Sequence, residues 1–143
     1  MDVFTVSTDR AALDVALIHR FLSEESYWAK GIPRKLVEKA LAHSLCFGGF
    51  IQGAQVAFAR VVSDYATFAY LADVFVLAEH RGRGYAKTLI AAVVAHPELQ
   101  GLRRFSLATA DAQGLYAAFG FTPLEYPDRY MERFQPRVYE QEL

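Results

Sequence analysis

The sequence predicts one domain of the α/β class, residues 1–143, in which strands and amphipathic helices alternate along the chain. Three observations predict this class. Two segments near the N-terminus carry apolar side chains at helical spacing, and three apolar runs rich in strand formers follow them. Residues 74–89 pass from an apolar run through a short polar connection into another stretch with helical spacing. The length of 143 residues fits a single domain and gives no reason to expect a second one.

The first elements predicted are a strand and a helix. Phe4 and Val6 belong to a short alternating run, as in a half-buried strand. Ser7, Thr8 and Asp9 are suited to capping the helix that follows. The apolar face of that helix is formed by Leu13, Leu17, Ile18, Phe21 and Leu22.

A loop over residues 27–33 carries two large aromatic side chains, and Pro33 suits the first turn of a second helix. The apolar side of that helix comprises Leu36, Val37, Ala40 and Leu41. The loop aromatics, Tyr27 and Trp28, either line a pocket or cover the core, and residue type leaves both interpretations open.

Residues 45–51 and 54–62 predict an antiparallel pair joined by a tight turn at Gln52 and Gly53. Residues 67–76 are almost wholly apolar, which predicts a strand buried on both faces. Asp73 is the exception in this run. A carboxylate at such a position requires a hydrogen bond, an ion pair or a water-filled cleft, and Arg60 is one candidate partner.

A third helix is expected from Gly84 to about residue 96, where Pro97 ends it. Residues 104–108 should form the next strand.

The last elements are a helix and two short strands. Thr109 or Asp111 can cap the helix, which is expected to run to Phe119 and stop at Gly120. Residues 121–122 should begin a strand, 123–129 should connect, and 130–134, which alternate in character, should form a final strand.

Composition excludes several classes of function. The net charge is -1, which gives no electrostatic basis for binding nucleic acid or an anionic membrane. A single cysteine, Cys46, excludes an internal disulfide and disfavours a thiolate metal site, and the histidines have no metal-ligand spacing. No basic leader and no apolar run of the length of a membrane span is present, so a cytoplasmic protein is expected.

The segment from Arg81 to Lys87 is suited to holding an anion. Gly82 and Gly84 lie where a loop enters a helix, and the first N–H groups of a helix have no internal partner and carry the positive end of its dipole. Arg81, Arg83 and Lys87 add full positive charges. A diphosphate fits such a site, although glycines before a helix also occur for backbone reasons alone.

Residues 81–86, Arg-Gly-Arg-Gly-Tyr-Ala, match every specified position of Q/R-x-x-G-x-G/A, the acyl-CoA loop of the GNAT superfamily of N-acetyltransferases. Residues 115–121, Leu-Tyr-Ala-Ala-Phe-Gly-Phe, resemble the later motif of that family, a helix with a tyrosine closed by Gly-Phe. The order of elements is also similar as far as Phe134. The resemblance implies a mixed, mostly antiparallel sheet that is splayed between its fourth and fifth strands and flanked by helices.

The resemblance also implies which residues contact acetyl-CoA. The pantetheine arm would run along Val74, Phe75 and Val76, with the N–H of Val76 meeting the thioester carbonyl. The diphosphate would lie on Arg81, Gly82, Arg83, Gly84, Tyr85, Ala86 and Lys87. Asp111 stands where relatives often have an asparagine that bonds the arm, and it lacks the amide donor.

The chemistry is expected from two side chains. Tyr116 matches the tyrosine that protonates the leaving thiolate in relatives, and its alternative role is core packing. Asp73 is the candidate base, placed by strand parity with Leu71 and Phe75, and Glu79 is a weaker alternative. Cys46 as a nucleophile is disfavoured, because a lone cysteine in an apolar strand is more often packing.

The function expected is transfer of an acetyl group from acetyl-CoA directly to a primary amine of a small molecule or peptide, with Tyr27 and Trp28 as candidates for the acceptor pocket and no metal. The alternative is a non-catalytic acyl-CoA-binding module. The sequence leaves the oligomeric state open, although an apolar edge strand near the C-terminus would make a homodimer unsurprising.

Overall fold

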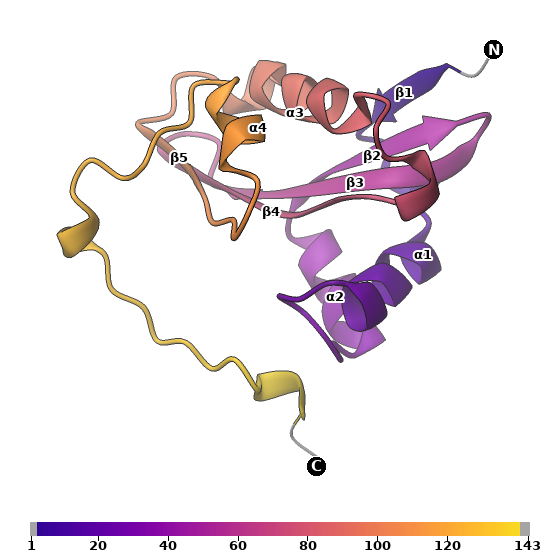
Figure 1. Cartoon of the computed structure of the whole chain (residues 1–143), viewed down its shortest axis with the longest axis horizontal. Coiled ribbons are helices and arrows are strands. Elements are labelled where there is room, and N and C mark those ends of the chain that lie inside the picture. Colours follow the sequence, from indigo (N-terminus) through magenta and orange to yellow (C-terminus); the bar gives the residue numbers. More distant parts are fainter. Residues whose placement is uncertain (1–2, 141–143) are drawn as a thin grey trace.

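The computed structural model describes residues 3–140 and consists of one five-stranded sheet with helices on both faces (Figure 1). The strands are β1 (Phe4–Ser7), β2 (Leu45–Ile51), β3 (Ala54–Ser63), β4 (Phe68–Val76) and β5 (Arg104–Leu107), and they lie in this order. The first four are antiparallel, and β5 is parallel to β4. The predicted α/β class and mixed, mostly antiparallel sheet are therefore confirmed.

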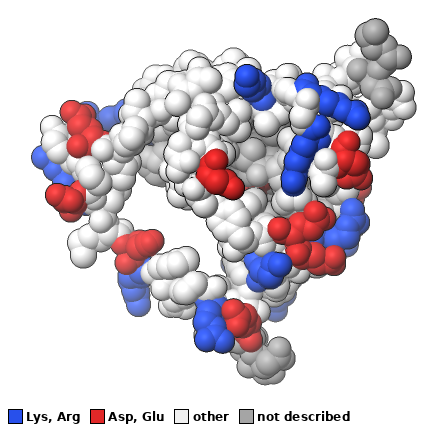
Figure 2. Space-filling model, viewed as in Figure 1, with Lys and Arg blue, Asp and Glu red and all other residues white. Residues whose placement is uncertain are grey.

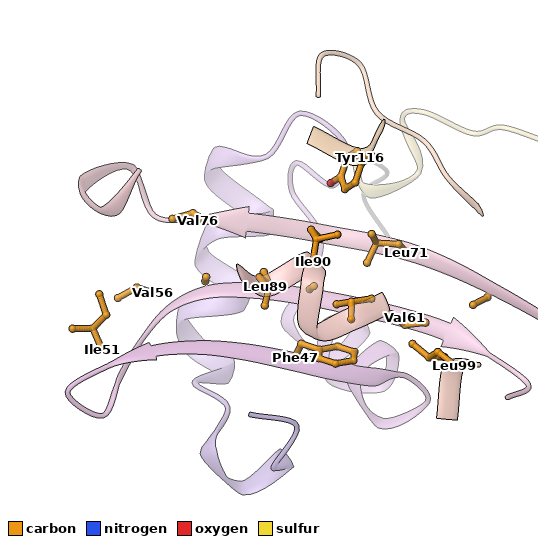
Figure 3. Close-up of a cluster of buried hydrophobic side chains, with 14 residues drawn as sticks. Phe47, Ile51, Val56, Val61, Leu71, Val76, Leu89, Ile90, Leu99 and Tyr116 are labelled. Atoms are coloured by element: carbon orange, nitrogen blue, oxygen red, sulfur yellow. The ribbon is translucent and has the colours of Figure 1, made fainter. Parts of the chain in front are cut away.

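Two helices lie on each face of the sheet. α1 (Val15–Arg20) and α2 (Arg34–Ala42) cover one face, and α3 (Tyr85–Ala95) and α4 (Gln113–Ala117) cover the other (Figure 1). Each pair has its own apolar core. The core around Leu89 and Ile90 of α3 packs against β2, β3 and β4 (Figure 3), and the core around Ile18 and Val37 packs under α1 and α2.

The hairpin between β2 and β3 forms at the predicted dipeptide. Gln52 has φ 51° and Gly53 has φ 81°, the left-handed values that a two-residue type I′ turn requires. A turn of this type matches the twist of the paired strands, so local sequence was sufficient to locate it.

The first helix starts later than predicted. Asp9 caps only a short 3-10 turn, Arg10–Ala12, after which Leu13 is extended. Asp14 then caps α1, its Oδ1 accepting from the N–H of Leu17 at 3.0 Å. A π-helical turn, Phe21–Glu25, continues the chain directly after α1. The apolar pattern that predicted one helix is therefore divided between a 3-10 turn and α1, because Asp9 and Asp14 each cap a helical segment.

The prediction that β4 is buried on both faces is wrong. Phe68 and Tyr70 are exposed, while Ala69 and Leu71, which alternate with them, are buried. Its register with β3 shifts near Asp73, which has φ 56°, so β4 carries a bulge. The bulge directs Leu71 to the α3 core and Phe75 to the α1–α2 core. The parity predicted for Asp73 therefore holds with Phe75 and fails with Leu71.

The two C-terminal strands predicted from the sequence are also absent from the part of the chain that the structure describes. Residues 122–138 instead form an extended segment, which we call the C-terminal arm (orange to yellow in Figure 1). It contains the 3-10 turn Pro127–Arg129, and its last residue is the first of another 3-10 turn, Val138–Glu140. Within residues 3–140 no strand lies beside the alternating pattern at 130–134, and a strand cannot form alone.

Candidate active site

The site begins where β4 and β5 separate. Their pairing runs from Phe68↔Arg104 to Leu71↔Leu107 and stops there, while β4 continues to Val76. Residues 72–76 thus have a strand partner on the β3 side only. The expected splay between the fourth and fifth strands is present, and it leaves one backbone edge of β4 open to a ligand that binds as an added strand.

The backbone of Val76 faces this open edge. The N–H of Leu77 donates to the carbonyl oxygen of Val56 in the β3 direction at 2.9 Å, and successive residues of a strand direct their backbone groups to opposite sides. The carbonyl oxygen of Val76 accepts from Nε of Arg81 at 2.8 Å. Its N–H, on the same side of the strand, is directed at the gap between β4 and β5.

The loop that contains Gly82 and Gly84, which we call the glycine loop, follows the C-terminal end of β4. Gly82 has φ 79° and Gly84, the N-cap of α3, has φ 81°, values that favour glycine. A Cβ at either glycine would meet nothing within 4 Å, and no side chain caps the helix. The end of α3 therefore presents bare N–H groups beside open space.

Basic side chains surround this end of α3 (Figure 2). Arg81, Arg83 and Lys87 are exposed, whereas Tyr85 and Ala86 are half-buried and start the helix. Tyr85 also stacks on Phe4 of β1, with ring centroids 4.3 Å apart, which anchors the first turn. Glu79, the weaker candidate base, lies exposed in the preceding turn Ala78–His80.

Asp73 occupies the bulge of β4 and contacts two partners. Its Oδ2 lies 2.7 Å from Nε of Arg60, and its Oδ1 accepts from Nε1 of Trp28 at 2.7 Å. The side chains of Arg60 and Asp73 are only 19% and 10% exposed. The ion pair raised as an alternative is thus present, and Arg60 also donates to Oγ of Ser44 at 3.1 Å.

Tyr27 and Trp28 reach across the site from the loop before α2. Tyr27 Oη accepts from the backbone N–H of Ala110, in the loop after β5, at 3.1 Å. The two rings meet edge to face with centroids 5.0 Å apart. Tyr27 is 65% exposed and Trp28 is 42% exposed, so they do not cover the core. The loop that carries Tyr27 and Trp28 therefore connects β4, through Asp73, with the loop that follows β5 on the other side of the splay.

Tyr116 lies on α4 at the margin of the α3 core (Figure 3). It is buried, and burial raises the pKa of its hydroxyl above 10.0, with smaller contributions in the same direction from Tyr27 and Asp111. Its ring meets Phe121 edge to face. The side chain is therefore packed in the core and protonated at neutral pH.

Asp111 is exposed in the loop between β5 and α4, and it does not cap the helix. Oγ1 of Thr109 accepts from the N–H of Ala112 instead, at 3.1 Å. α4 is also shorter than predicted, because it ends at Ala117 before Gly120 turns the chain with φ 91°.

The splay thus brings together side chains that are far apart in the sequence. Tyr27 and Trp28 meet the bulge at Asp73 and the loop at Ala110, while Val76 and the glycine loop form the other end of the site. Ser44 and Ala110 were not predicted. Nothing in their local sequence signals these contacts, which depend on pairing across the fold.

The positions of other ionisable groups limit the chemistry. Among residues 3–140, no group of three or more His, Cys, Asp or Glu side chains could hold a metal ion. Burial raises the pKa of the Cys46 thiol to about 11, and Cys46 lies in β2 beneath α2. No helix within the same residues is long and apolar enough to cross a membrane.

Comparison with known proteins gives consistent results. A model of the acetyltransferase (GNAT) family matches residues 41–121. A Gibberella zeae protein whose name proposes an acetyltransferase is 33% identical over 135 residues, covering 79% of this chain and 75% of that protein.

Solved structures give the same result. The crystal structure of a proposed GNAT acetyltransferase from Xanthomonas campestris pv. campestris is 65% identical, with a TM-score of 0.96 over 99% of each chain. The aminoglycoside N-acetyltransferase AAC(6')-Iy, in complex with CoA, shares the fold at 20% identity, with a TM-score of 0.64 over 96% of this chain and 97% of that one.

Proposed function

The chain belongs to the GNAT family of acetyltransferases, and we propose that it transfers an acetyl group from acetyl-CoA directly to a primary amine. One observation carries the proposal. The open edge of β4 and the uncapped N-terminus of α3 are adjacent, and Arg81 links them through its bond to Val76. An extended arm bearing a diphosphate at one end fits such a surface.

Two groups of residues would contact different parts of acetyl-CoA on this surface. In the proposal, the N–H groups of Gly84 and the first turn of α3 hold the diphosphate, with Arg81, Arg83 and Lys87 supplying charge. Residues 74–76 bond the pantetheine arm as a strand would. The space beside Gly82 and Gly84 supports this arrangement, because a phosphate can approach backbone that no Cβ covers.

The N–H of Val76 is proposed to bind the carbonyl oxygen of the thioester. As the amine nitrogen forms a bond to the carbonyl carbon, negative charge develops on that oxygen, and a fixed N–H donor stabilises it. When the carbon–sulfur bond breaks, the hydroxyl of Tyr116 donates its proton to the departing thiolate. The raised pKa of Tyr116 supports this role, since the proton is present at neutral pH.

Asp73 is proposed to accept the proton that the attacking amine loses. Its carboxylate oxygens hold lone pairs beyond those used by Arg60 and Trp28. Trp28 and Tyr27 would then border the acceptor, and their exposed rings suit the apolar part of an amine substrate.

A second candidate is the non-catalytic acyl-CoA-binding module, which two observations favour. Tyr116 packs in the core, and Asp73 is paired with Arg60, so each side chain has a structural role without chemistry. Under this candidate the cofactor surface is intact and no turnover occurs.

An assay of CoA release separates the two. The chain is incubated with acetyl-CoA and a panel of amines comprising amino acids, polyamines, aminoglycosides and peptides, and free thiol is followed with a chromogenic reagent. Release that depends on an amine, with a product heavier by one acetyl group, supports the enzyme. Tight binding of acetyl-CoA with no acetylated product from any amine supports the module. Failure to bind acetyl-CoA contradicts both.

A further inference from the structure

We propose that the amine acceptor of this chain is an organic ammonium compound that has an aromatic or other apolar body and no carboxylate beside its amino group. Amines of this class are the decarboxylated counterparts of amino acids. The inference rests on the proposed acetyl transfer, whose acceptor it narrows. Three features at the acceptor end of the splay carry it: a mostly buried carboxylate, an aromatic corner and a second carboxylate.

The mostly buried carboxylate is that of Asp73, in the bulge of β4. Its side chain is only 10% exposed, and Nε of Arg60 holds its Oδ2 at 2.7 Å. Its Oδ1 accepts the N–H of Trp28 and keeps a second lone pair for another donor. A carboxylate that is mostly shielded from water attracts an ammonium group more strongly than an exposed one does, because solvent screens it less.

Tyr27 and Trp28 form the aromatic corner beside this carboxylate. Their ring planes meet at 84°, with centroids 5.0 Å apart, and the side chains are 65% and 42% exposed. Both rings are fixed, Trp28 by its bond to Asp73 and Tyr27 by the bond from Ala110. Two fixed rings at a right angle offer cation–π contact to an ammonium group and apolar contact to the body attached to it. The corner therefore favours an organic cation over a small hydrophilic amine.

Asp111 adds the second carboxylate, on the β5 side of the splay. It is exposed, and it directly follows Ala110, whose N–H bonds to Tyr27. Burial raises the pKa of the Tyr116 hydroxyl, and Tyr27 and Asp111 raise it further, so both side chains lie near that hydroxyl. In the proposed reaction the amine is acetylated between Asp73 and Tyr116. Its substituents are therefore within the field of both carboxylates.

A carboxylate on the acceptor would find no free counter-charge here. Among the described residues, the only cationic side chain bonded to any of these groups is Arg60. It donates from Nε to Asp73 and from Nη1 to Oγ of Ser44, and it is only 19% exposed. The basic side chains beside the glycine loop lie at the other end of the site, where they are proposed to hold the diphosphate. An amino acid would thus meet repulsion from Asp73 and Asp111 without compensation, which is how a site rejects one ligand and keeps another.

Trp28 supplies the probe that tests this class of acceptor, because it is the only tryptophan of the chain. Its emission is followed in the full chain in the presence of CoA, which has no acetyl group to give, so binding is measured without turnover. The ligands are phenethylamine, phenylalaninamide and phenylalanine at about pH 6, where their amino groups are protonated. The amide has the size of phenylalanine without its negative charge, so the comparison separates charge from size.

We expect phenethylamine and phenylalaninamide to change the emission of Trp28 and to bind at least about tenfold more tightly than phenylalanine. Asp111→Asn should lower the affinity ratio of amide to phenylalanine by at least about threefold, since it removes one repelling charge. A ratio measured within one variant cancels any effect of the substitution on CoA binding. Glu98→Gln is the matched control and should leave the ratio unchanged, because it makes the same change of charge in an exposed turn at the opposite end of α3 from the glycine loop.

The CoA-release assay with the same ligands separates this inference from the proposed function. A higher kcat/KM for phenethylamine and phenylalaninamide than for phenylalanine supports both. Absence of acetylated product from every amine of the panel would contradict the acetyl transfer, and the titration of Trp28 would still decide the class of ligand. Phenylalanine bound as tightly as its amide, an emission that responds to none of the three ligands, or an unchanged ratio in Asp111→Asn would overturn the inference.

Discussion

The indole Nε1 of Trp28 donates a hydrogen bond of 2.7 Å to Oδ1 of Asp73, which joins the loop before α2 to the bulge of β4 across 45 residues of sequence. The other oxygen of Asp73 is held by Arg60. Trp28, a candidate for lining the acceptor pocket, and Asp73, the candidate base, are thus connected, and substitutions at either residue test their separate roles.

Asp73→Asn should preserve the backbone, because asparagine tolerates a φ of 56° better than other residues with a side chain. If Asp73 accepts the proton of the amine, kcat should fall by about 100-fold. Trp28→Phe removes the N–H donor and keeps an aromatic ring, and should mainly raise KM for the amine. Two acceptors of different basicity are needed: a pH-rate limb that follows the acceptor and persists in Asp73→Asn would exclude the aspartate as base.

Arg60→Met should destabilise the fold by about 3 kcal/mol, because it leaves a mostly buried carboxylate without its counter-charge. Urea denaturation of parent and variant measures the difference. Combining Arg60→Met with Asp73→Asn removes the unpaired charge and should restore most of the lost stability. A double variant no more stable than Arg60→Met would show that the guanidinium acts through packing alone.

Gly84→Val should weaken binding of acetyl-CoA by at least tenfold, because a side chain at the N-cap of α3 would occupy the space proposed for the diphosphate. Gly101→Val is a matched control. Gly101 also has a left-handed φ, of 74°, and a Cβ there meets nothing within 4 Å, so both variants carry similar backbone strain. Titration calorimetry should show normal affinity for the control. Equal losses in the two variants would attribute the effect to strain.

Tyr116→Phe should lower kcat by about 100-fold and leave acetyl-CoA affinity nearly unchanged, since it removes one hydroxyl and keeps the buried ring. Tyr70→Phe, on the exposed face of β4, is the control and should turn over at the parent rate. Because burial raises the pKa of Tyr116, its proton is lost only above pH 10, so no activity loss from this group is expected on the acid side. A Tyr116→Phe enzyme with the parent kcat would leave positioning as the source of catalysis.

Cys46 should resist alkylation in the native state. Burial raises its pKa from 9.0 to about 11, so at pH 8 the folded chain carries about 100-fold less thiolate than the unfolded chain. The folded state binds the proton of the Cys46 thiol more tightly than the unfolded state does. The stabilisation that results is complete below pH 9 and is lost as pH rises towards 11. Mass spectrometry after iodoacetamide, with and without urea, measures the ratio. Equal rates in both states would contradict a buried thiol.

Most of the fold followed from local patterns. Residues 45–51 and 54–62 formed the strands expected from their composition, and Gln52 and Gly53 formed the turn expected from theirs. The glycine loop took its expected place before α3 because left-handed residues at a helix start are a local requirement. The first helix was divided because two aspartates could each cap it, and local sequence does not rank them.

Hydrophobic period, turn chemistry and helix caps act between residues that are close in the chain, and they were enough to predict the α/β class, the places of the five strands along the chain and the glycine loop. The remaining features depend on contacts between distant residues. The bulge at Asp73 and its ion pair with Arg60 depend on the register of β4 against β3, and the bond from Ala110 to Tyr27 depends on how two loops meet across the splay. Residues 130–134 have the pattern of a strand, but a strand forms only where a second backbone pairs with it, and none of the other described residues does so.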